Sequence, residues 1–140
     1  MADFDGAKFG QWLRANVAPP ATYPFGNGQC ALHVRLALAA AGLVPATHPA
    51  DAKDWGPTLL TLGFAATPAA AYTAAAGDIC VIQPTSACPD GHMEGYDGQN
   101  WISDFVQRAF WPGPSFRAEL PAYVVYRWPG AGMGGGERAS

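Results

Sequence analysis

The chain has 140 residues and a net charge of −3, with 49% hydrophobic and 14% charged residues. This length allows one domain with a buried core, and so large a hydrophobic fraction excludes an intrinsically disordered chain. A nucleic-acid-binding protein would normally carry a basic face, so the low and slightly acidic charge argues against nucleic acid as a partner.

The N-terminal half is predicted to be helical. Apolar residues recur on roughly one stripe over residues 4–17, which predicts a first helix. Residues 18–29 contain three prolines and two glycines and are expected to form a loop. A shorter helical segment is expected over residues 51–62, which Pro57 interrupts.

Between these segments the pattern predicts a helix from Cys30 to Ala41. The alanine-rich run is a good helix former, and Gly42 ends it as a typical C-terminal residue. We expect Leu32 and Leu36 to face inward.

From Gly77 onward the chain is predicted to form strands. Residues 78–83 are an apolar run, and residues 122–128 are rich in aromatic and β-branched side chains. Residues 92–96 and 100–106 are expected to pair as a hairpin, because an Asp-Gly turn signal lies between them. Helices followed by an antiparallel sheet predict an α+β fold.

We find neither a repeat nor a second domain, so residues 1–128 are expected to form one domain and the glycine-rich residues 129–140 a disordered tail. No apolar run approaches the roughly 18 residues that span a bilayer, so no membrane partner is expected. Charged residues interrupt the N-terminus, which therefore does not resemble a secretory signal peptide. The sequence predicts synthesis in the cytoplasm and a soluble monomer.

Cys30 and His92 are the candidate catalytic pair. Cys30 stands where a glycine-rich loop turns into a helix, and a helix start stabilises a thiolate and offers N–H groups to an oxyanion. His92 follows Gly91 at the start of a strand, where an imidazole can take the thiol proton. His33 and His48 are interpreted as structural.

A third group usually orients the histidine, and the neighbouring strand offers Asn100, Ser103 and Asp104. A three-residue hairpin loop would place Asp104 opposite His92, whereas a two-residue turn would place Ser103 there. Asp104 is preferred because a carboxylate also stabilises an imidazolium.

A metal site is the rival use of cysteine and histidine. The sequence has neither CxxC nor HxxxH, and Cys80, Cys88 and His92 are only three loosely spaced ligands. We therefore expect no metal and no cofactor.

Three short blocks resemble CHAP and NlpC-type peptidoglycan hydrolases, which are papain-like. They are Tyr23 to Arg35 with its Gly-Gln-Cys triplet, Gly77-Asp78 with the later Gly91-His92, and Trp101 to Asp104. They follow the family's order between residues 23 and 104, which is more than half of the chain. The chain is most similar in organisation to the amidase effectors of type VI secretion systems, which have one domain and no leader.

The resemblance implies cleavage of an amide bond in peptidoglycan stem peptides through a thioester, with Cys30, His92 and Asp104 as catalytic residues. It also implies contacts of Tyr23, Gln29 and Ala31 with substrate or oxyanion. As an antibacterial toxin the protein would act in the periplasm of a target bacterium and would have an immunity protein as inhibitor. A Cys80–Cys88 disulfide could form there.

Three other functions are alternatives. The chain could be the catalytic domain of a phage-type lysin, a papain-like hydrolase that acts on a protein, or a binding module of the same fold without catalysis.

Overall fold

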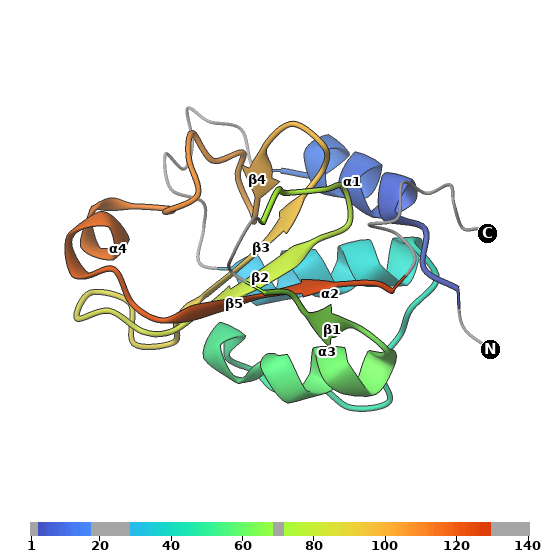
Figure 1. The fold of residues 1–140 in the computed structure, drawn as a ribbon, viewed down its shortest axis with the longest axis horizontal. Helices are drawn as coiled ribbons and strands as arrows, with labels where there is room; N and C mark the ends of the chain where they lie inside the picture. The colour runs from blue at the N-terminus through green and yellow to red at the C-terminus, as the bar shows by residue number, and fades with distance from the viewer. Residues whose placement is uncertain (1–2, 18–28, 69–71, 130–140) are drawn as a thin grey trace.

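A five-stranded antiparallel sheet with helices packed on it forms the centre of the structure (Figure 1). The computed structural model describes residues 3–17, 29–68 and 72–129. Tyr23 and nearly all of the predicted tail lie outside the described residues. The elements in chain order are α1 (Gly6–Ala15), α2 (Cys30–Ala40), the 3-10 helix η1 (Ala52–Asp54), α3 (Gly56–Leu62), β1 (Ala65–Ala66), β2 (Ile79–Ile82), β3 (His92–Tyr96), β4 (Trp101–Ile102), α4 (Pro114–Glu119) and β5 (Tyr123–Arg127).

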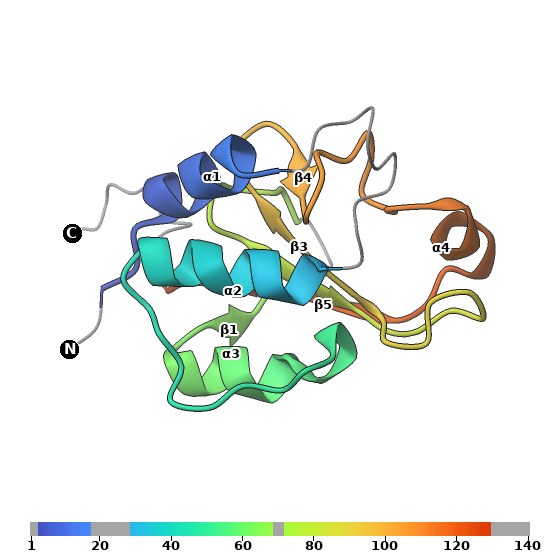
Figure 2. The ribbon, with the colours of Figure 1, turned by 180° about the vertical axis from the view of Figure 1, so that it is seen from behind.

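The strand order is β1-β5-β2-β3-β4, and every pair of neighbours is antiparallel. α1 and α2 lie against one face of the sheet, as Figure 2 shows from behind. Aromatic residues from the second half of the chain pack on the other face. The expected α+β fold is therefore confirmed, although the sequence analysis missed β1 and α4.

α1 packs closely on β3. The helix begins at the N-cap Asp5, whose carboxylate accepts a 3.0 Å hydrogen bond from the Lys8 N–H. Its buried side chains, Phe9 and Leu13, press on the backbone of Gly95. A Cβ atom at Gly95 would lie 2.5 Å from the Phe9 ring, so this approach requires glycine.

α2 buries a different face from the one expected. Val34, Ala37 and Leu38 are fully buried, whereas Leu32 and Leu36 are each 37% exposed. The prediction was wrong because apolar residues surround almost the whole helix, so that periodicity alone does not select a face. Packing against α1 and β3 makes the choice.

The hairpin between β3 and β4 has a four-residue loop, so both loop lengths considered from the sequence were wrong. Tyr96 pairs with Trp101, and the Asp97 N–H donates to the carbonyl of Asn100 across the loop. The Asp97 carboxylate accepts the Asn100 N–H at 2.8 Å and so holds Asn100 in the turn. Neither register inferred for His92 therefore applies.

After β4 the chain folds back on itself. The Ser103 N–H donates to the Phe105 carbonyl, and Val106 forms an isolated antiparallel bridge with Ile102. The Gln107 N–H then donates to the carbonyl of Trp101 at 2.9 Å. This turn carries Gln107 back beside the sheet.

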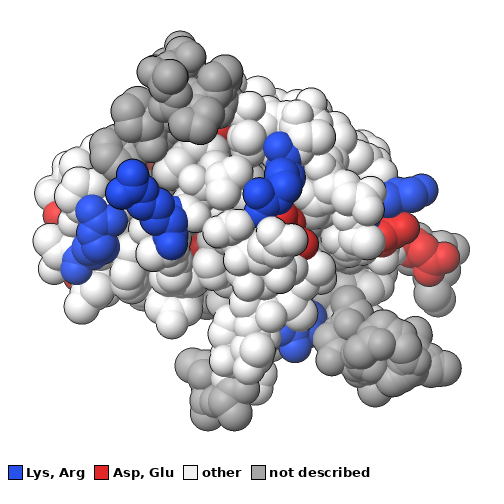
Figure 3. Space-filling model, turned by 90° about the horizontal axis from the view of Figure 1, so that it is seen from above, with Lys and Arg blue, Asp and Glu red and all other residues white. Residues whose placement is uncertain are grey.

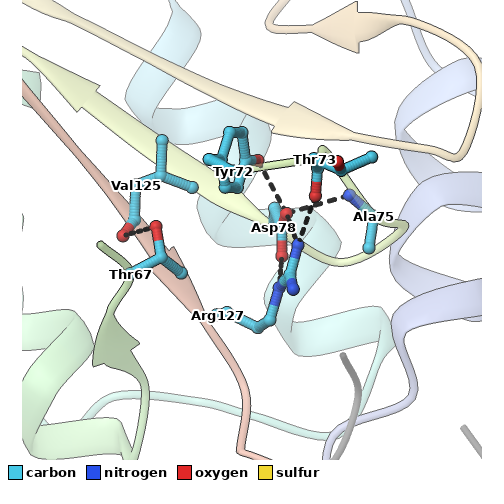
Figure 4. Close-up of polar contacts among 7 residues, drawn as sticks. All are labelled: Thr67, Tyr72, Thr73, Ala75, Asp78, Val125 and Arg127. Carbon is cyan, nitrogen blue, oxygen red and sulfur yellow. Dashed lines mark hydrogen bonds and ion pairs between the residues drawn. The ribbon is translucent and has the colours of Figure 1, made fainter. Parts of the chain in front are cut away.

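A buried ion pair joins the start of β2 to the end of β5 (Figure 4). Asp78, which is 1% exposed, accepts hydrogen bonds from Arg127 on both carboxylate oxygens, each at 2.8 Å. The Tyr72 hydroxyl and the Ala75 N–H donate to the same carboxylate at 2.7 and 2.9 Å. The Gly77-Asp78 motif thus has a structural reason, because Asp78 anchors the segment that leads into β2.

Charged side chains are sparse on the face shown in Figure 3, where Lys and Arg stand among larger uncharged areas. Among the described residues, no helix has both the length and the apolar character that crossing a membrane would require.

The Asp78 ion pair predicts a measurable stability difference. We expect Asp78→Asn to lower the free energy of unfolding by about 2 kcal/mol, because it leaves a partly buried guanidinium without its counter-charge. Asp54→Asn makes the same chemical change in an exposed pair with Lys53 and should leave the urea midpoint unchanged. Equal midpoints for the two variants would contradict the prediction.

Candidate active site

A cleft of about 650 Å³ lies at the start of α2. Cys30, His92 and Asp104 line it, as do Gln29 and Ala31. Of the predicted site residues that the structure describes, all except Cys80 line this cleft. Tyr23 lies outside the described residues. The whole lining comprises residues 29–32, 50–52, 87–92, 104–105 and 112–116.

Cys30 is the first residue of α2, as predicted, and its side chain is half-buried. The residue before it, Gln29, is the N-cap, and the Gln29 N–H donates to the Asp104 carboxylate at 3.0 Å. Asp104 therefore attaches the turn after β4 to the backbone that leads into the cysteine. The start of a helix offers free backbone N–H groups and a partial positive charge to the cleft.

His92 is the first residue of β3 and is 7% exposed. Gly91 precedes it with φ of +75°, and a Cβ atom there would lie 2.5 Å from the carbonyl oxygen of Ile82. Only glycine fits this position, so the Gly-His pair reflects how tightly the chain enters the strand. The imidazole also lies 5.7 Å from the Phe116 ring.

Three side chains act on His92. The hydrogen bonding and charge of Cys30 raise the pKa of the ring. Nε2 lies 2.8 Å from Gln107 Oε1 and 3.3 Å from Glu94 Oε1. Burial alone would lower the pKa of His92, but the hydrogen bonds and charges of Cys30 and Glu94 outweigh it and raise the pKa to about 10.

The raised pKa has a chemical consequence. A histidine with this pKa is charged at neutral pH, and an adjacent imidazolium stabilises a cysteine thiolate. The cleft thus contains a candidate cysteine nucleophile and a candidate acid–base histidine, the two groups that cysteine attack on a carbonyl requires.

The candidates for the orienting residue lie in different surroundings. Asn100 accepts a 2.7 Å hydrogen bond from Arg14, and the Ser103 hydroxyl is buried without a hydrogen-bond partner among the described residues. Asp104 lines the cleft and binds Gln29. The groups that the structure shows on His92 Nε2 are instead Gln107 and Glu94, so the orienting role of Asp104 stays a prediction.

Sequence reasoning did not identify Gln107 or Glu94. Glu94 could have been found from the sequence, because residues two apart on a strand point to the same face of the sheet and Glu94 follows His92 by two. Gln107 carries no such signal, since only the turn after β4 brings it to the histidine.

All three cysteines are free thiols in this structure, including Cys80 and Cys88, whose pairing the sequence analysis considered for the periplasm. Cys80 is buried in β2, and burial raises the pKa of its thiol well above the ordinary value. Cys88 is half-buried and lines the cleft. Among the described residues, no three His, Cys, Asp or Glu side chains gather as metal ligands would.

A cysteine that opens a helix packed on an antiparallel sheet, next to a histidine at a strand start, is the arrangement of papain-like proteins. No family model and no curated protein matches the chain. Two solved structures match it: native and selenomethionine crystals of the type VI effector–immunity complex Tae3-Tai3 from Ralstonia pickettii. Identity is 38% in both, with TM-scores of 0.81 and 0.77; the alignments cover 89% and 86% of this chain and 99% of the matched chain. The chain therefore belongs to the Tae3 family of type VI effectors.

The contact with His92 predicts that Cys30 is the reactive thiol. At neutral pH we expect iodoacetamide to alkylate Cys30 faster than Cys88, and buried Cys80 not to react in the folded protein. His92→Ala should slow the reaction of Cys30 by about tenfold or more, since the thiolate loses its counter-charge. Peptide mapping by mass spectrometry measures all three rates, and equal rates at Cys30 and Cys88 would disprove the assignment.

Proposed function

We propose that this protein is a cysteine amidase that hydrolyses an amide bond in the stem peptides of peptidoglycan. The observation that carries the proposal is that Cys30, the first residue of α2, and the buried His92 line the same cleft. Membership of the Tae3 family supports it, because the matched structures are of an antibacterial-type effector bound to its immunity protein.

The first half of the reaction forms a thioester. The Cys30 thiolate attacks the carbonyl carbon of the scissile amide, and the negative charge moves to the carbonyl oxygen. In this scheme the free backbone N–H groups at the start of α2, that of Ala31 among them, stabilise the charge on that oxygen. The His92 imidazolium then gives its proton to the leaving nitrogen, so that the amine departs.

The second half releases the acid. Neutral His92 takes a proton from water, whose oxygen attacks the thioester carbonyl. Collapse of this intermediate expels the Cys30 thiolate and restores the thiolate–imidazolium pair. The reaction therefore needs a histidine that alternates between its charged and neutral forms while its ring stays next to the cysteine.

Asp104 and Gln29 support the nucleophile in this scheme. The Asp104 carboxylate accepts a hydrogen bond from the N–H of Gln29, the residue before Cys30. This bond fixes the backbone at the helix start. The N–H groups that follow remain aimed along the helix axis toward the cleft. We propose that this anchoring sets the oxyanion site.

The proposal predicts a specific loss of cell-wall digestion. Incubation with purified sacculi should release muropeptides with one newly cleaved amide bond, and Cys30→Ala should abolish the release by removing the nucleophile. Mass spectrometry of the fragments identifies the bond. Cys80→Ala is the matched control, because it truncates a buried cysteine that does not line the cleft and should keep the activity.

Digestion of sacculi by a folded Cys30→Ala variant would overturn the cysteine mechanism. Release of peptides from a protein substrate, with intact sacculi, would favour a papain-like hydrolase that acts on proteins instead.

We further propose that the enzyme acts in the periplasm of a target bacterium and that an immunity protein inhibits it there. When directed to the periplasm of a Gram-negative host, the chain should stop growth, whereas the same chain retained in the cytoplasm should not reach its substrate. Cys30→Ala should be harmless in both places, and co-production of the cognate inhibitor in the periplasm should restore growth. Growth arrest by the cytoplasmic form would contradict the proposed location.

A further inference from the structure

A fully buried carboxyl group lies behind the histidine of the cleft. Glu94 is 0% exposed, and its Oε1 lies 3.3 Å from His92 Nε2 and accepts a 2.9 Å hydrogen bond from Gln107 Nε2. Its other oxygen, Oε2, has no hydrogen-bond partner among the described residues. Burial of an incompletely paired carboxyl group is costly, so a fold that keeps one beside the candidate catalytic histidine calls for a functional reason.

The orientation of the Gln107 amide is determined by its surroundings. Its nitrogen lies 2.9 Å from Glu94 Oε1 and 3.1 Å from the carbonyl oxygens of both Ala109 and Phe110. The two carbonyl oxygens can only accept hydrogen bonds, so the NH₂ group must face them. The amide oxygen therefore faces His92, where it can only accept.

This orientation assigns the protons of His92. Because Gln107 Oε1 accepts at 2.8 Å, Nε2 of the ring carries a hydrogen in both the neutral and the charged form. Nδ1 is left as the nitrogen that exchanges a proton with Cys30. A histidine held in this way presents the basic nitrogen to the thiol without a change of tautomer.

An amide cannot balance the charge of an imidazolium, but a carboxylate can. We propose that Glu94 is the positioning residue of this active site: it holds the Gln107 amide that fixes the tautomer of His92, and its negative charge sustains the imidazolium opposite the Cys30 thiolate. This inference rests on the proposed function and extends it from the Cys30–His92 pair to a chain of four side chains.

The charged and titratable groups near Glu94 lie on three elements that pack together. His92 shares its strand, Cys80 lies directly opposite on β2, and Cys30 faces His92 from α2. Burial raises the pKa of Glu94 above its ordinary value, and the hydrogen bonds of His92 and Gln107 and the charge of His92 offset only part of this rise. Burial also raises the pKa of Cys80, so this thiol stays neutral and does not compete for the charge.

Two variants separate the two parts of the proposal. Glu94→Gln keeps an acceptor oxygen for Gln107 but removes the charge, whereas Gln107→Ala keeps the charge and removes the amide. Asp78→Asn is the matched control, because it makes the same carboxylate-to-amide change at an equally buried site away from the cleft.

The first readout is the rate of Cys30 alkylation as a function of pH. In Glu94→Gln the thiolate should form at higher pH, by about one unit, which makes alkylation at neutral pH about tenfold slower. Asp78→Asn should leave the profile of its folded fraction unchanged. An unchanged profile in Glu94→Gln, or the same shift in Asp78→Asn, would overturn the proposed charge.

The second readout is the ¹⁵N NMR spectrum of the His92 ring during titration. In the wild type Nδ1 should lose its proton as the pH rises and Nε2 should keep it, and in Gln107→Ala both neutral tautomers should appear. Loss of the proton from Nε2 in the wild type would overturn the assignment, even if Glu94→Gln fails to fold.

Neither readout uses peptidoglycan, so the two proposals fail separately. Sacculi left intact by a wild type with the expected titrations would overturn the substrate, and sacculi digested without these titrations would overturn the role of Glu94 alone.

Discussion

The packing of α2 against β3 is the contact on which the rest of the structure depends. It places the first residue of the helix, Cys30, beside the first residue of the strand, His92. The two residues are 62 positions apart in the chain, and only this contact makes them neighbours. α1 packs on the same strand beside α2, and Gly95 allows this because Phe9 of α1 lies directly on the strand backbone there.

Two buried carboxyl groups show how the fold treats charge. Asp78 accepts hydrogen bonds from Arg127, a tyrosine hydroxyl and a backbone N–H. Its charge is balanced by Arg127, and the ion pair links the start of β2 to the end of β5. Glu94 has an amide and a histidine as neighbours and one oxygen without a partner among the described residues. The first arrangement satisfies the group fully, whereas the second leaves it dependent on the protonation of His92. The two carboxyl groups differ in their partners rather than in their burial.

The cleft has a further property that follows from its construction. The start of α2 and four other segments of the chain form its walls. Several of these segments are loops between elements. Loops on a rigid sheet can vary in shape without disturbing the Cys30–His92 contact. The sheet and α2 thus hold the candidate Cys30–His92 pair, while loops form much of the cleft wall.

The sequence by itself determined the elements with strong local signals. α2 begins at Cys30 as predicted because a glycine-rich loop precedes an alanine-rich run, and β3 spans the predicted residues 92–96. The Cys30 and His92 candidates and their place in a papain-like fold also followed from local pattern. Short elements such as β1 and α4 have too few residues to carry a periodic signal.

Only the tertiary structure decided the rest. The buried face of α2 depended on its neighbours, because the helix is apolar nearly all round. The hairpin register depended on how Asp97 binds its own loop, and with it the expected partners of His92 changed. Gln107 reaches the histidine through a turn whose geometry no local pattern encodes. Local sequence picks out the candidate pair Cys30 and His92, whereas long-range packing brings Gln107 and Glu94 into contact with the histidine.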